Sequence, residues 1–126
     1  MGRELTVWLG RKTLRFPIAT HWAVRVGDYE WYEIDGAGKS EGEDNTINGD
    51  FPGTAYLNSR HSRLGAVATH AAGCTKKFDA DIISFNQKFL AEHPKYKVIT
   101  CNCQVYAVAF IQWLTDGACE LPLMEL

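Results

Sequence analysis

Alternating apolar and polar positions predict a β-rich N-terminal half. Residues 5–9 form a short apolar run, and the Gly-Arg-Lys segment at residues 10–12 predicts a turn after it. The clearest pattern is HWAVRV at residues 21–26 followed by YEWYEI at residues 29–34. These two β-rich runs meet at a Gly-Asp pair, so they predict a β-hairpin.

Beyond the hairpin the pattern changes from strand to helix. Residues 35–53 are rich in Gly, Asp, Glu, Asn and Ser, which predicts a surface loop. Residues 64–70 predict another strand. Residues 79–92 have apolar side chains on one face and are followed by Pro94, so they predict an amphipathic helix. A last short strand is predicted at residues 96–99.

The stretch TCNCQVYAVAFIQWL at residues 100–114 predicts a second, more buried helix. Asn102 is a favourable N-cap, and Asp116 with Gly117 predicts the helix end. Cys103 then lies in the first turn, where free backbone N–H groups and the helix dipole favour a thiolate. A reactive thiol is one interpretation. The other is a small buried hydrophobic residue at a helix start.

Composition limits the classes of protein to be considered. The chain has 126 residues, 46% of them hydrophobic, which suits a single α+β domain spanning residues 1–126. The formal charge of -2 and the lack of a dense Lys/Arg cluster predict no nucleic-acid partner. No window reaches the roughly 20 apolar residues of a membrane span, and the N-terminus lacks a signal-peptide pattern. Four unevenly spaced cysteines predict reduced thiols in a cytoplasmic protein.

Neither a metal nor another cofactor is predicted. Cys101-x-Cys103 lacks the second ligand pair of a zinc site. A cluster of His61, His70 and Cys74 is conceivable but has no compact ligand spacing. The acidic loop resembles a calcium loop only in part, because Ala55 stands where the closing glutamate belongs.

A base for the thiol is predicted in the hairpin. His21 opens the first strand, and Glu33 lies at a similar height on the second. Opposite strands of a hairpin approach each other, so this carboxylate can hold the imidazole ring. A base positioned by a third polar group is what activates a nucleophilic thiol. The alternative is an edge-strand histidine bonded to backbone.

Two segments carry a family resemblance. HWAVRVGDYEWYE at residues 21–33 resembles the histidine box of the permuted papain-like thiol enzymes, in the branch of lecithin retinol acyltransferase and the small phospholipase/acyltransferases. NCQVYAVAFIQWL from Asn102 is similar to the Asn-Cys-Glu-His-Phe-Val motif of that family. The order of the motifs also agrees, with histidine first and cysteine near the C-terminus. The resemblance implies a circularly permuted papain-like fold, in which an antiparallel sheet packs against a helix that carries the cysteine at its N-terminus.

The resemblance also implies roles for individual residues. Cys103 is the nucleophile, His21 the general base, and the Cys103 backbone N–H part of an oxyanion hole. The motif neighbours are assigned to substrate binding; they are Trp22, Asn102 and Gln104. Lipid-active members usually carry a second histidine where this chain has Glu33, and they tend to have an apolar C-terminal anchor that this chain lacks. Both departures leave amide and peptide substrates open, as in the related NlpC-type cell-wall peptidases and the PPPDE-like, deubiquitinase-like members.

The leading hypothesis is therefore a cysteine hydrolase or acyltransferase that forms a thioester on Cys103 with His21 as base. Its substrate is an amide, a peptide or an acyl ester. A second hypothesis is a catalytically silent domain that binds a partner with the same cleft. A third is a redox pair of Cys101 and Cys103, although the C-x-C spacing strains a disulfide.

Overall fold

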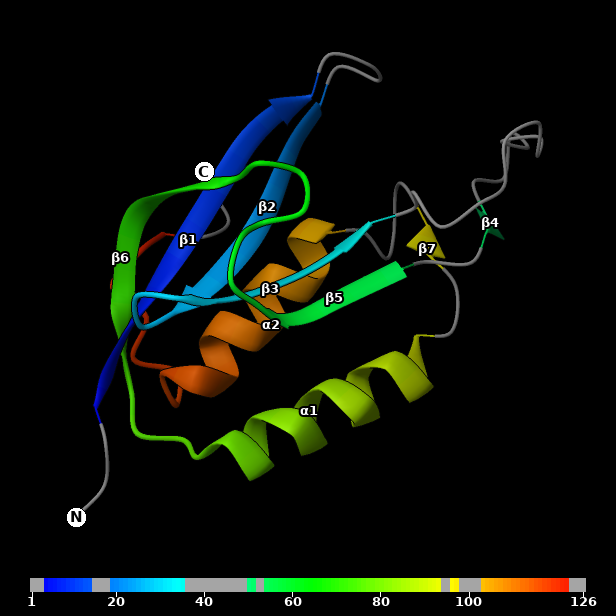
Figure 1. Ribbon diagram of the computed structural model, residues 1–126. Helices are drawn as coiled ribbons and strands as arrows, with labels where there is room; N and C mark the ends of the chain where they lie inside the picture. Colours follow the sequence, from blue (N-terminus) through cyan, green and yellow to red (C-terminus); the bar gives the residue numbers. More distant parts are fainter. Residues whose placement is uncertain are drawn as a thin grey trace.

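The chain forms an antiparallel sheet with two helices (Figure 1). The computed structural model describes residues 4–14, 19–35, 50–51, 54–93, 96–97 and 103–122. Five of the strands make one antiparallel sheet in the order β5-β3-β2-β1-β6, and two short strands, β4 and β7, pair separately. The elements are β1 (Leu5–Leu14), β2 (Ala19–Val26), β3 (Glu30–Asp35), β4 (Asp50–Phe51), β5 (Thr54–Ser59), β6 (Val67–Thr75), α1 (Asp79–Glu92), β7 (Tyr96–Lys97) and α2 (Cys103–Leu114). The predicted α+β class is confirmed.

Strand β1 runs without a break through the segment predicted to turn. The turn expected at residues 10–12 is wrong, because β1 continues to Leu14 and pairs with both β2 and β6. Glycine at position 10 leaves room for the side chain of Trp31. A Cβ at this position would lie 2.5 Å from the Trp31 ring, which crosses the strand. Glycine in a strand therefore marks a close approach here, not a chain reversal.

The predicted hairpin is confirmed as β2 and β3. Gly27 adopts φ +68° in the connecting turn, a conformation that suits glycine, and its N–H donates to the Thr6 carbonyl at 2.8 Å. Pairing between the two strands covers three residue pairs, from Val26 with Glu30 to Val24 with Tyr32. Beyond the last pair the strands separate, and Figure 1 shows them diverging. We call this opening the β2/β3 fork.

Two edge strands differ from expectation. No sequence pattern predicts strand β5, because apolar and polar side chains do not clearly alternate along it. It pairs with β3 across an irregularity in register, where Asn58 adopts a positive φ of 53°. Strand β6 begins at Val67 instead of residue 64 and continues past the predicted Ala-Ala-Gly boundary to Thr75. Residues 60–66 thus form a turn and not the start of the strand.

Both helices have the predicted bounds. Helix α1 spans Asp79–Glu92, and α2 begins at Cys103 and ends at Leu114. The end of α2 is fixed by Gly117, whose φ is +79° and whose N–H donates to the Gln112 carbonyl at 2.8 Å. Predicted features that lie outside the described residues are the Asn102 N-cap, residues 98–99 of the last strand and most of the loop at 35–53.

The main core lies between the sheet and the helices. Val24 of β2, Tyr32 of β3 and Phe110 of α2 are buried in it, and the Tyr32 and Phe110 rings meet edge to face at 5.1 Å. A buried polar contact joins the helices, because the Tyr106 hydroxyl donates to the Asn86 side-chain oxygen. Within the described ranges, no helix is long and apolar enough to span a membrane.

Candidate active site

The candidate site forms where the start of α2 meets the β2/β3 fork. Val24 and Tyr32 form the last pair before the fork opens, so His21 and Glu33 both lie within the fork. Register with β1 places His21 opposite Lys12, and register with β5 places Glu33 opposite Tyr56. Helix α2 begins close to the fork (Figure 1). The fold therefore brings together three residues that lie 12 and 70 positions apart in sequence.

Cys103 is the first residue of α2, and its thiol faces the strands. The side chain is 6% exposed. The Trp22 backbone N–H donates to the sulfur at 3.5 Å, which ties the thiol to β2. The sulfur thus lies where the free N–H groups of the first turn of α2 meet strand β2.

His21 and Glu33 form a buried pair. His21 Nε2 lies 2.7 Å from Glu33 Oε1, and the two side chains are 1% and 0% exposed. Because Glu33 engages Nε2, Nδ1 is the ring nitrogen left to face the thiol, and the Cys103 side chain is a hydrogen-bonding partner of this imidazole. The predicted Cys103, His21 and Glu33 thus occur as one connected chain of contacts.

The environment favours the protonated imidazole. Burial alone lowers the pKa of His21, but the hydrogen bonds and charges of Cys103 and Glu33 outweigh it and raise that pKa from 6.5 to about 9. The carboxyl behaves in the opposite sense. Burial raises the pKa of Glu33, yet the bonds from His21, the Arg63 backbone and Ser62 lower it overall from 4.5. At neutral pH the pair is an imidazolium next to a carboxylate.

Two hydrogen-bond partners of Glu33 are not predicted by any sequence pattern. Ser62 Oγ lies 2.9 Å from Glu33 Oε1, and the Arg63 backbone N–H donates to Oε2 at 2.9 Å. Both come from the turn at residues 60–66, which follows the unpredicted strand β5. No motif points to them, since one contact is a backbone group and the other is a single serine 29 residues from its partner. The glycine at position 65 is the sequence feature that could have indicated a turn there, and it adopts φ +81°.

The three predicted substrate-binding residues differ in placement. The Gln104 side-chain amide donates to the Thr20 carbonyl at 3.0 Å and so links the first turn of α2 to β2 beside His21. The Trp22 ring is packed in the main core, while its backbone N–H reaches the thiol. Asn102 lies outside the described residues. Substrate binding by these three residues stays a prediction.

The other histidines and cysteines that the structure describes are not among the contacts of this site. His61 is exposed, His70 contacts the Thr69 hydroxyl, and Cys74 is an exposed free thiol. In the described part of the chain, no three His, Cys, Asp or Glu side chains come together as a metal site would require. Cys101 is outside that part, so the redox pairing of Cys101 with Cys103 stays a prediction.

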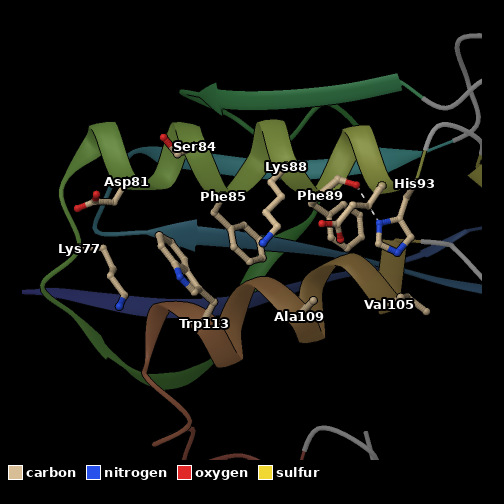
Figure 2. Close-up of a pocket in the computed structure, with 11 residues that line it drawn as sticks. Lys77, Asp81, Ser84, Phe85, Lys88, Phe89, His93, Val105, Ala109 and Trp113 are labelled. Atoms are coloured by element: carbon tan, nitrogen blue, oxygen red, sulfur yellow. Dashed lines mark hydrogen bonds between the residues drawn. The ribbon is translucent and has the colours of Figure 1, made fainter.

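A separate groove runs between the two helices (Figure 2). Its volume is about 890 Å³, and its lining includes Phe85 of α1 and Trp113 of α2, whose rings stack with centroids 4.7 Å apart. On α2 the groove is lined by Val105, Ala109 and Trp113. At about 100° per residue, Val105 lies about 200° around the helix from Cys103. The helix groove therefore opens on a different flank of α2 from the one that carries the thiol.

Comparison of the chain with protein-family models, with curated proteins and with solved structures found no match. The geometry of Cys103, His21 and Glu33 is therefore the feature from which a function can be inferred.

Proposed function

We propose that this protein is a cysteine-dependent hydrolase or acyltransferase that forms a thioester on Cys103. One observation carries the proposal, namely the buried His21–Glu33 pair at 2.7 Å with the thiol of Cys103 as the next partner of the imidazole. A nucleophile, a base and a group that orients the base are the parts that covalent acyl transfer requires.

The chemistry follows from these contacts. The Cys103 thiolate attacks the substrate carbonyl carbon, and the carbonyl π electrons move to oxygen. N–H groups at the start of α2, including that of Cys103, are suited to stabilise this oxyanion. As the tetrahedral adduct collapses, the C–N or C–O bond to the leaving group breaks and the His21 imidazolium gives it a proton. Neutral His21 then takes a proton from water or an acceptor amine, which attacks the thioester and releases Cys103.

Glu33 performs the orienting role in this proposal. A carboxylate on Nε2 fixes the ring so that Nδ1 faces sulfur, and it favours the imidazolium that accompanies a thiolate. The order of the site residues, with histidine before cysteine, together with the antiparallel sheet and the cysteine helix, supports a circularly permuted papain-like enzyme. With a carboxylate in the third position, we favour amide and peptide carbonyls as substrates alongside acyl esters.

The direct test is to trap the acyl-enzyme. The protein is incubated with an activated acyl ester, a peptide amide and a ubiquitin-type conjugate, quenched in acid and measured by intact mass spectrometry. We expect an adduct of the acyl mass that maps to Cys103 and is released by hydroxylamine. Cys103→Ala should abolish the adduct, whereas Cys74→Ala, which removes an exposed free thiol, should leave it unchanged.

The same experiment separates the enzyme from a silent binding domain. A binding domain forms no acyl adduct with any donor and keeps its affinity for a partner in Cys103→Ser. Failure of all donor classes to acylate folded wild-type protein, or an adduct that persists in Cys103→Ala, would contradict the proposal.

A further inference from the structure

The turn at residues 60–66 is built around the Ser62 hydroxyl. The Ala66 backbone N–H donates to Ser62 Oγ at 2.9 Å, and the Gly65 N–H donates to the Ser62 carbonyl at 3.3 Å. Ala66 itself is buried against Trp31 and Ala23 on the outer face of the sheet. The position of the hydroxyl is therefore fixed by its own turn and by the packing beneath it.

The direction of these hydrogen bonds is also fixed. A serine hydroxyl has one hydrogen to donate and two lone pairs. Because Ala66 supplies an N–H, Ser62 Oγ must accept there, and its hydrogen goes to Glu33 Oε1 at 2.9 Å. Glu33 Oε1 accepts from His21 as well, and Oε2 accepts the Arg63 N–H. Three donors thus converge on one carboxylate that is 0% exposed.

We propose that Ser62 is a positioning residue of the active site, which holds the Glu33 carboxylate in the orientation that directs His21 at Cys103. The role rests on the proposed thioester chemistry, and it acts through Glu33 without touching substrate. A buried carboxylate needs its lone pairs satisfied to remain charged and in one rotamer. Removing the hydroxyl leaves Oε1 with His21 as its one donor among the contacts described above.

The other titratable groups near Glu33 do not replace Ser62. Tyr106 of α2 interacts with Glu33 electrostatically, but burial, followed by the charges of Tyr32 and Glu33, raises the pKa of Tyr106 well above 10.0, so it stays neutral. Its hydroxyl is committed to Asn86. The Arg63 guanidinium lies over the Tyr56 ring at 5.1 Å, and Arg63 reaches Glu33 through its backbone.

The test measures the titration of His21 by NMR in Ser62→Ala and Ser62→Thr. In wild-type protein we expect a midpoint near the raised pKa of about 9. Ser62→Ala should shift this midpoint to lower pH by about 0.5 units or more, since a carboxylate released from its fixed orientation pairs less closely with the imidazolium. Ser62→Thr retains the hydroxyl and should restore the wild-type midpoint. This restoration remains a test even where the alanine variant folds poorly.

The matched control is Ser84→Ala, which removes an exposed hydroxyl on α1 and should leave the midpoint unchanged. An unshifted midpoint in folded Ser62→Ala, or a threonine variant that titrates like alanine, would overturn the role of Ser62. Neither readout depends on turnover. Failure of the thioester proposal is seen separately, as wild-type protein that forms no acyl adduct.

Discussion

At the scale of single residues, the site depends on charge held out of water. His21 and Glu33 are almost completely buried, and each lacks the solvation that a charged group normally needs. The pair is retained because each charge satisfies the other and because donors from the 60–66 turn complete the carboxylate. Replacing either residue by an uncharged one should therefore strongly shift the pKa of the residue that remains.

Glu33→Gln should lower the midpoint of the His21 titration. The raised pKa of about 9 means that the imidazolium is favoured below that pH and lost as pH rises through it. Without the carboxylate, burial again favours the neutral ring, so the alkaline limit moves to lower pH. We expect Cys103 alkylation at pH 7 to slow by roughly tenfold or more. Glu120→Gln, an exposed control, should alter neither quantity, and an unchanged midpoint in Glu33→Gln would contradict the pairing.

Gln104→Ala should loosen the first turn of α2 from β2. Its amide donates to the Thr20 carbonyl, next to His21, and the loss of a hydrogen bond of this kind costs about 1 kcal/mol. We expect Cys103 reactivity to fall several-fold while the His21 titration remains raised. Gln112→Ala removes an exposed glutamine from the same helix and provides the comparison. Equal reactivity in the two variants would show that the Thr20 contact has no positioning role.

At the scale of elements, the two helices are joined by aromatic rings and one buried polar contact. Phe89 meets Tyr106 edge to face at 5.2 Å, and the Tyr106 hydroxyl donates to Asn86. Asn86 in turn donates to the Ile82 carbonyl at 3.0 Å, so its orientation is fixed within α1. This contact fixes the position of α1 against α2, the helix that carries the thiol.

Tyr106→Phe should destabilise the fold without removing any apolar contact. The substitution leaves the Asn86 side-chain oxygen buried without its donor, which costs about 1–3 kcal/mol. Urea unfolding followed by circular dichroism measures this loss. Tyr29→Phe, at a tyrosine that is 63% exposed, should change the free energy of unfolding by less than about 0.5 kcal/mol. Similar losses in both variants would contradict a structural role for the contact.

Elements with a strong hydrophobic period could be predicted from the sequence, and edge strands could not. Both helices have the expected bounds, and the hairpin occurs where it is expected although β2 begins at Ala19 and β3 spans Glu30–Asp35. One face of each of these elements is buried in the same core. Strand β5 lies at the sheet edge with Leu57 and Asn58 exposed, so burial imposes little pattern on it. Gly10 suggested a turn because the Trp31 ring above it is a long-range contact that no local pattern contains.

Part of the candidate site could likewise be predicted from the sequence, and part of it could not. Cys103, His21 and Glu33 could be predicted because each belongs to a recognisable local pattern, a helix start or the two arms of a hairpin. Ser62 could not, because its role arises from a turn that is brought to Glu33 by the irregular register of β5. Sequence patterns therefore singled out three residues that the fold brings together, and they missed the turn that contacts Glu33.

At the scale of the whole molecule, stability should fall in acid as Glu33 is protonated. Its folded pKa lies below 4.5, so its contribution is complete above pH 4.5 and is lost as pH falls through the folded value. In urea unfolding between pH 3 and pH 6, wild-type protein should lose stability more steeply than Glu33→Gln. Glu120→Gln should follow the wild-type curve. Parallel curves for wild type and Glu33→Gln would contradict the buried charged pair.

The central claim is that the fold joins the start of α2 to the β2/β3 fork so that His21 activates Cys103. The most direct measurement is the rate of Cys103 alkylation by iodoacetamide at pH 6, followed by peptide mapping, with Cys74 as an exposed thiol in the same molecule. We expect Cys103 to react faster than glutathione and faster than Cys74, and His21→Ala to slow it by roughly tenfold or more. A Cys103 that reacts no faster than glutathione at pH 6, or whose rate is unchanged in His21→Ala, would contradict the account.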